Sequence, residues 1–127
     1  MLKPVKKRFD LTVNAANGTV TKTFELEKNI KFITGLLFTA NRDDLLYYRG
    51  MQKVEINKNE YFPENYESKL LMTGINVPPN NRYFYFKEKV NVGNGSVKVV
   101  FTDTDDGRTV FADYRVSLYL DCEQEDI

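Results

Sequence analysis

Apolar and polar positions alternate along most of the last third of the chain. Between residues 96 and 102, Val97, Val99 and Phe101 share one side of an extended backbone. A two-residue period is that of a strand with one buried face. Tight turns at 93–95 and 105–107 separate three such runs, so residues 82–120 are expected to form three successive strands. The last run predicts a long core strand with six inward positions: Val110, Ala112, Tyr114, Val116, Leu118 and Leu120.

The same period occurs in the first third of the chain. Residues 8–15 alternate cleanly, Asn17-Gly18 favours a tight hairpin turn, and residues 19–28 alternate again. Residues 29–40 are apolar on both faces, which predicts a strand in the middle of the structure. Gly35 within it indicates a bulge or a close backbone approach. The expected phases of this strand are Ile30, Phe32, Leu36 and Phe38 on one side, with Ile33 and Leu37 on the other.

The middle of the chain is less regular. Residues 41–46 read as a loop with a single helical turn, and residues 52–57 as a further strand. Pro63 is expected to end strand pairing because proline has no amide hydrogen. Residues 65–73 fit either a strand or two turns of helix. We favour a strand, since Gly74 and the Val77-Pro78-Pro79 segment close it off.

These patterns predict a fold class. Eight or nine strands, with a turn signal about every ten residues, favour an all-β protein with little helix. The expected architecture is an antiparallel β-sandwich of the jelly-roll type. A length of 127 residues matches a single domain spanning residues 1–127.

Charge is unevenly distributed at the two ends of the sequence. Residues 1–7 are interpreted as a basic tail and residues 121–127 as an acidic tail, both in solvent. The alternative is that the basic end pairs with an acidic end, of the same subunit or of the next. The charged residues are Lys3, Lys6, Lys7 and Arg8 at the start, and Asp121, Glu123, Glu125 and Asp126 at the end.

The overall composition excludes several classes of partner. Eighteen basic residues balance eighteen acidic ones, so no single-sign field favours nucleic acid or an anionic membrane. We expect no secretory signal, since no apolar run follows the first charges, and no apolar span of about 20 residues occurs in the sequence. Cys122 is the only cysteine, which precludes an intrachain disulfide and is typical of a protein that folds in a reducing cytoplasm.

Few residues could perform catalysis. The chain has no histidine, which removes the usual general base and the commonest zinc ligand. Carboxylates near Cys122 should raise its thiol pKa and make it unreactive. The acidic turn at 103–107, together with Asp113, could hold a glycosidase pair or a weak calcium loop. We favour an exposed turn, and therefore expect no enzyme, no catalytic or metal site, no cofactor and no small-molecule substrate.

Aromatic residues provide the positive signal. In Tyr83-Phe84-Tyr85-Phe86, neighbouring side chains on a strand must face opposite sides, so core positions for Phe84 and Phe86 would turn Tyr83 and Tyr85 outward. Exposed tyrosines favour a protein interface or a platform on which sugar rings stack. The candidate interface comprises Tyr47, Tyr48, Tyr83 and Tyr85, with Lys6, Lys7, Arg8, Glu123, Glu125 and Asp126 from the charged ends.

Several segments resemble a known group of proteins. The chain is similar to small β-sandwich virion proteins of tailed phages of gut Bacteroidetes, including the crAss-like group. The resemblance implies an auxiliary or decoration protein on the capsid surface, which contacts the major capsid protein and further copies of itself. The alternative is a carbohydrate-binding sandwich. The similar segments are Glu55-Ile56-Asn57, Glu60-Tyr61-Phe62-Pro63, Leu70-Leu71 and Val77-Pro78-Pro79-Asn80-Asn81-Arg82-Tyr83-Phe84.

Overall fold

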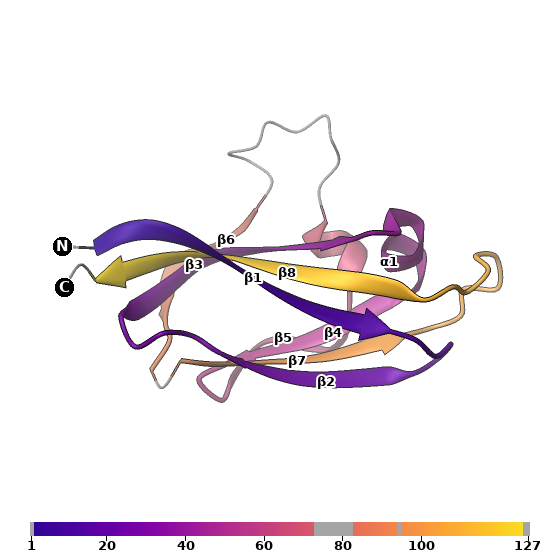
Figure 1. Cartoon of the computed structure of the whole chain (residues 1–127), viewed down its shortest axis with the longest axis horizontal. Helices are drawn as coiled ribbons and strands as arrows, with labels where there is room; N and C mark the ends of the chain where they lie inside the picture. The colour runs from indigo at the N-terminus through magenta and orange to yellow at the C-terminus, as the bar shows by residue number, and fades with distance from the viewer. Residues whose placement is uncertain (1, 73–82, 94, 126–127) are drawn as a thin grey trace.

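The computed structural model consists of two stacked β-sheets with one short helix at one end (Figure 1). It describes residues 2–72, 83–93 and 95–125. Within them, the helix has seven residues, and no helix is long and apolar enough to cross a membrane. The elements are β1 (Leu2–Val13), β2 (Thr19–Glu25), β3 (Ile30–Ala40), α1 (Asp43–Arg49), β4 (Gly50–Ile56), β5 (Asn59–Glu67), η1 (Ser68–Leu71), β6 (Phe84–Asn91), β7 (Ser96–Asp103) and β8 (Tyr114–Glu125).

The strand order confirms the predicted sandwich. One sheet has the order β1-β8-β3-β6 and the other β2-β7-β4-β5. The first strand pairs with the last, the second with the seventh, the third with the sixth and the fourth with the fifth, all antiparallel. This is a long hairpin of eight strands rolled into two layers, the jelly roll.

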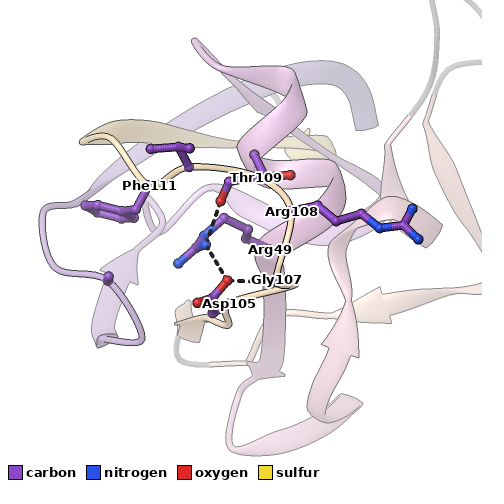
Figure 2. Close-up of a pocket in the computed structure, with 8 residues that line it drawn as sticks. Arg49, Asp105, Gly107, Arg108, Thr109 and Phe111 are labelled. Atoms are coloured by element: carbon purple, nitrogen blue, oxygen red, sulfur yellow. Dashed lines mark hydrogen bonds and ion pairs between the residues drawn. The ribbon is translucent and has the colours of Figure 1, made fainter.

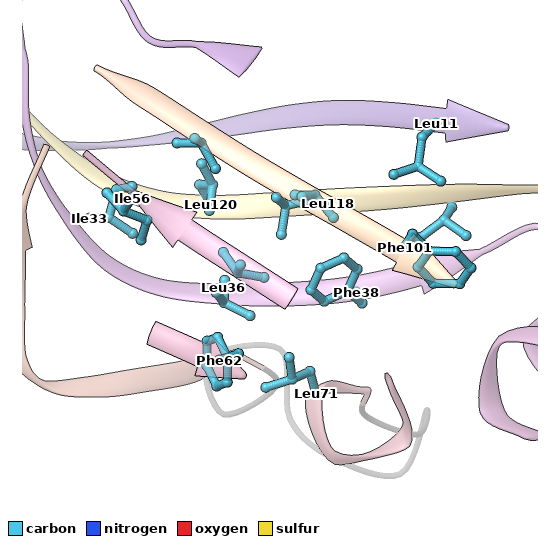
Figure 3. Close-up of a cluster of buried hydrophobic side chains, with 14 of the residues drawn as sticks. Leu11, Ile33, Leu36, Phe38, Ile56, Phe62, Leu71, Phe101, Leu118 and Leu120 are labelled. Atoms are coloured by element: carbon cyan, nitrogen blue, oxygen red, sulfur yellow. The ribbon is translucent and has the colours of Figure 1, made fainter. Parts of the chain in front are cut away.

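The core lies between the sheets and is filled from both inner faces (Figure 3). Val97, Val99 and Phe101 are fully buried, as predicted. The prediction of six inward positions in the last strand is only partly right. That strand begins at Tyr114, and Val110 is 84% exposed. The reason is the Asp106 carboxylate, which accepts backbone hydrogen bonds from Arg108 and Thr109 and holds this segment in a turn.

Strand β3 contains the bulge that Gly35 indicated. Its register with β8 shifts between Ile33 and Gly35. The extra residue reverses the alternation, so Ile33 shares the inner face with Leu36 and Phe38, whereas Phe32 faces outward. The predicted phases of this strand were therefore wrong for Phe32 and Ile33. Ile30 is buried with Leu36 and Phe38, as predicted, because the register shifts a second time between Ile30 and Phe32.

The charged ends are strands in the described part of the chain. Leu2 pairs with Glu125, and the ladder between β1 and β8 continues to Val13. Lys6 Nζ lies 3.4 Å from Asp121 Oδ1. The interpretation as solvated tails is thus wrong for these residues, and the alternative, pairing of basic and acidic ends within one subunit, is confirmed. Asp126 lies outside the described residues.

The middle of the chain departs from prediction in two places. The predicted helical turn is longer than expected, because α1 continues to Arg49. Strand β5 ends at Glu67 and is followed by the 3-10 helix η1, so the strand predicted for residues 65–73 is wrong after Glu67. Helical winding buries Leu71 against the core. Residues 73–82, with the predicted proline loop, lie outside the described part of the chain.

Candidate protein interface

The outer face of the β1-β8-β3-β6 sheet, which points away from the other sheet, brings together distant parts of the sequence. Lys6 on β1 neighbours Asp121 on β8, Asp121 neighbours Gly35 on β3, and Gly35 neighbours Tyr85 on β6. A Cβ atom at Gly35 would lie 2.8 Å from Cδ1 of Tyr85. The absence of a side chain at Gly35 therefore allows the Tyr85 ring to cover the sheet at this point.

The two tyrosines predicted to face outward lie beside each other on this face. The ring centroids of Tyr83 and Tyr85 are 6.1 Å apart with an interplanar angle of 29°. Lys6 Nζ is 4.6 Å from the centroid of Tyr83, a cation–π contact. Burial, with a smaller contribution from Asp121, raises the pKa of the Tyr83 phenol. Tyr83 is therefore neutral at ordinary pH.

A second cation–π contact on the outer face joins Arg8 on β1 to Tyr119 on β8. The Arg8 guanidinium is 5.6 Å from the centroid of Tyr119, and Arg8 Nε donates to Asp10 Oδ1 at 3.0 Å. Asp10 also accepts a 2.7 Å hydrogen bond from the Ser117 hydroxyl. These two donors, Ser117 first, lower the pKa of Asp10 and keep it ionised.

A third ring and cation pair completes the outer face. Lys89 Nζ is 4.4 Å from the centroid of Phe32 and 3.0 Å from Glu123 Oε1. The outer face thus presents aromatic rings whose neighbouring cations are each paired with a carboxylate. Such a surface can contact a protein or a sugar through its rings without burying an uncompensated charge.

The remaining predicted contact residues do not join the outer face. Tyr47 and Tyr48 lie on α1, which packs on η1, β3 and β4, and their side chains are 46% and 60% exposed. Lys7 points toward the other sheet and pairs with Glu27 at 2.6 Å. Glu125 Oε2 lies 3.8 Å from Lys31 Nζ at the end of the sheet. Five of the predicted contact residues therefore lie on the outer face: Tyr83, Tyr85, Lys6, Arg8 and Glu123. The prediction wrongly grouped them with residues that lie elsewhere on the molecule.

Sequence reasoning missed two rings of the outer face. Tyr119 occupies the outward phase of β8, so its alternation could have identified it. Phe32 could not be identified, because the bulge before Gly35 determines its direction.

Phe84 and Phe86 point inward, as predicted, but they do not fill the centre of the core. Both rings contact Phe62 of the opposite sheet, at 5.4 and 6.0 Å between centroids. Tyr61 contacts Phe86 at 5.7 Å. Because β5 and β6 are edge strands, this cluster lies at the margin of the sandwich, and Phe84 is 40% exposed.

A buried ion pair lies at the end of the sandwich near α1. Arg49 donates to Asp103 through Nε at 3.0 Å and Nη2 at 2.8 Å, and the two side chains are 2% and 0% exposed. Asp103 also accepts from the Tyr114 hydroxyl at 2.8 Å and the Asn17 amide at 3.0 Å. Burial raises the pKa of Asp103, but hydrogen bonds from Arg49, Asn17 and Tyr114 outweigh it, so the pKa lies below its usual value. The prediction that Asp103 belongs to an exposed turn is wrong, because β7 carries it into the interior.

A hollow of about 290 Å³ adjoins this ion pair (Figure 2). Arg49 Nη1 donates to Asp105 Oδ1 at 3.2 Å and to the Thr109 carbonyl at 2.9 Å, while the Arg108 side chain points away from Arg49. The ring of Phe111 lies 5.5 Å from the guanidinium. Arg49 therefore uses its charge to fix the segment between β7 and β8.

The acidic turn is arranged to bind its own backbone. Asp105 Oδ1 accepts from the Gly107 amide, and hydrogen bonds from Thr109 and Arg108 lower the pKa of Asp106 to about 2. Within residues 2–72, 83–93 and 95–125, no three histidine, cysteine or acidic side chains are placed to hold a metal ion. The carboxylates of Asp103, Asp105 and Asp106 are thus directed at different internal donors.

Cys122 lies on the inner face of β8, not at the margin of an acidic tail. Burial, followed by the charge of Asp121, raises the pKa of its thiol to about 12. The thiol is therefore protonated at neutral pH.

Comparisons with known proteins do not assign this chain to a family. No family model, curated protein or solved structure matches the chain. Its function is therefore inferred from the residues and their arrangement.

Proposed function

We propose that this protein is a noncatalytic structural protein of a phage particle. It acts as an auxiliary or decoration subunit on the capsid surface, made in the host cytoplasm, and bridges neighbouring capsid subunits. One observation carries the proposal: the outer face of the β1-β8-β3-β6 sheet gathers aromatic rings with cations laid over them, at Tyr83, Tyr119 and Phe32.

The composition of this face favours a protein partner. Tyrosine, phenylalanine and arginine are enriched at protein interfaces. Rigid rings lose little conformational entropy when they are covered, and the paired charges fix register. Jelly rolls are common among capsid proteins, but a fold alone does not specify a function, so the proposal depends on the face.

Binding to particles tests the proposal directly. Purified capsids that lack the protein are mixed with wild type or with the double variant Lys6→Glu/Arg8→Glu, and bound protein is measured by co-sedimentation. Reversing both cations on β1 should abolish binding while the fold, followed by circular dichroism, persists. The matched control is Lys22→Glu/Lys58→Glu, whose two lysines are exposed in the part of the chain that forms the other sheet. Absence of wild-type binding, or equal loss in the control, would contradict the proposal.

The nearly parallel rings of Tyr83 and Tyr85 favour a second candidate, a carbohydrate-binding module. Affinity electrophoresis in gels containing several polysaccharides separates the two functions. A capsid protein should migrate without retardation. Retardation that disappears in Tyr83→Ala/Tyr85→Ala would establish sugar stacking instead.

A further inference from the structure

The three cations that lie over rings of the outer face are each held a second time by their own chain. Each of them also lies within 3.4 Å of a carboxylate oxygen. The pairs are Lys6 with Asp121 at 3.4 Å, Arg8 with Asp10 at 3.0 Å, and Lys89 with Glu123 at 3.0 Å. Two opposite charges at such a distance act on a third molecule as a dipole, because their Coulomb fields largely cancel.

The other charges of the outer face lie at its margins. Lys87 and Glu88 are exposed neighbours of opposite sign on the edge strand β6. Arg115 also points outward on β8, four residues before Tyr119, which is about 13 Å along the strand. That distance exceeds the Debye length of about 8 Å at physiological salt. The part of the face that carries the rings is therefore close to electrically neutral.

The rings of the outer face are already occupied by cations. A cation–π contact requires a cation within about 6 Å of a ring centroid. Lys6, Arg8 and Lys89 fill that position at 4.6, 5.6 and 4.4 Å over their respective rings. A lysine or arginine of a partner placed beside one of these rings would meet a like charge.

A carboxylate of a partner is disfavoured for a related reason. It would have to draw a cation of the outer face away from its own carboxylate, and would then lie beside that second anion. Asp121 shows the cost most clearly, because its side chain is only 15% exposed and has little access to water once Lys6 is withdrawn. Removing one member of a covered ion pair leaves an uncompensated charge, which is costly.

We infer that the partner covers the outer face with an uncharged patch, which places no carboxylate, lysine or arginine against the rings. This inference rests on the proposed function and deepens it, because it specifies the chemistry of the capsid surface that the protein recognises. The attraction comes from apolar surface removed from water and from hydrogen bonds with the hydroxyls of Tyr83 and Tyr119. The strength of binding therefore depends little on salt.

A salt titration of particle binding provides the first test. Wild-type protein is co-sedimented with capsids that lack it, at about 50 and about 500 mM sodium chloride, over which the Debye length falls from roughly 14 to roughly 4 Å. The dissociation constant should change by less than about threefold. A contact between oppositely charged patches would instead weaken by about tenfold or more over the same range.

The pair of Lys6 and Asp121 provides the second test, a double-mutant cycle read out by the same co-sedimentation. Lys6→Met and Asp121→Asn each leave one charge uncompensated on the covered surface, so each should raise the dissociation constant by about tenfold. The double variant removes both charges and should bind more tightly than either single variant. If Lys6 instead paired with a carboxylate of the partner, Asp121→Asn would tighten binding, since the competing anion is gone.

The matched control is the pair of Lys98 and Glu55 on the outward side of the other sheet. Its atoms lie 3.8 Å apart, and its acid is less exposed than its lysine, as in the pair of Lys6 and Asp121. Lys98→Met and Glu55→Gln should leave particle binding unchanged, and circular dichroism checks the fold of every variant.

Three results would overturn the inference and leave the proposed function in place. They are a steep dependence of wild-type binding on salt, tighter binding by Asp121→Asn, and a double variant that binds no better than the weaker single variant. Absence of wild-type binding at every salt concentration would overturn the proposed function as well.

Discussion

Replacing Arg49 by methionine removes the cation of a fully buried ion pair. Methionine occupies the space of the aliphatic part of the arginine side chain, so the main loss is the charge. Asp103 keeps its hydrogen bonds from Tyr114 and Asn17 but faces no guanidinium. Removing one partner of a buried ion pair costs about 3–5 kcal/mol. That is a large share of the roughly 5–15 kcal/mol by which a domain is stable.

The expected result has a pH dependence of defined sign. In wild type the pKa of Asp103 is lowered, so its contribution to stability is present above the usual carboxyl pKa of 3.8 and is lost as pH falls through the folded value. In Arg49→Met, burial is the main remaining influence and raises this pKa. Folding of the variant then takes up a proton, and its stability rises as pH falls. The difference between wild type and variant should therefore shrink between about pH 7 and about pH 4.

Urea unfolding at several pH values measures the loss of unfolding free energy and its pH dependence, and thermal unfolding gives an independent estimate of the loss. The midpoint of thermal unfolding should fall by roughly 10–20 °C near neutral pH. Arg42→Met is the matched control, because Arg42 forms an exposed ion pair with Asp44 just before α1 and should matter little. Adding Asp103→Asn to Arg49→Met removes the buried charge and should restore part of the stability. A loss below about 1 kcal/mol, or a loss that is equal at all pH values, would refute this account of the ion pair.

Three further outcomes are expected. Gly35→Ala should lower the free energy of unfolding by about 1–3 kcal/mol in denaturant titrations, because the added Cβ would lie 2.8 Å from the carbonyl oxygen of Phe84; unchanged stability would mean that β6 does not approach this closely. Phe38→Ala should cost about 3–5 kcal/mol by the same measurement, and a small effect would place Phe38 outside the core. Cys122 should react with a colorimetric thiol reagent only after unfolding, since its pKa is about 12; rapid reaction of the folded protein would contradict its inward orientation on β8.

Local periodicity determined the strands and much of the core. Alternation identified Val97, Val99 and Phe101 as inward residues, and Gly35 identified the bulge in β3. These features are encoded by neighbouring residues, because the side-chain period of a strand depends only on the backbone of that strand. The same logic failed at Phe32, where one extra residue reversed the alternation.

Contacts between distant segments were decided by the tertiary structure. Arg49 and Asp103 are 54 residues apart, and nothing near either residue indicates that they meet in the interior. In the same way, the rolled hairpin places Lys6 of the first strand over Tyr83 beside the sixth. Local pattern specifies which face of a strand a residue occupies but not which residue it contacts. For this reason the acidic turn and the basic end were interpreted as solvated. Which partner a residue meets depends on the order in which the strands pack.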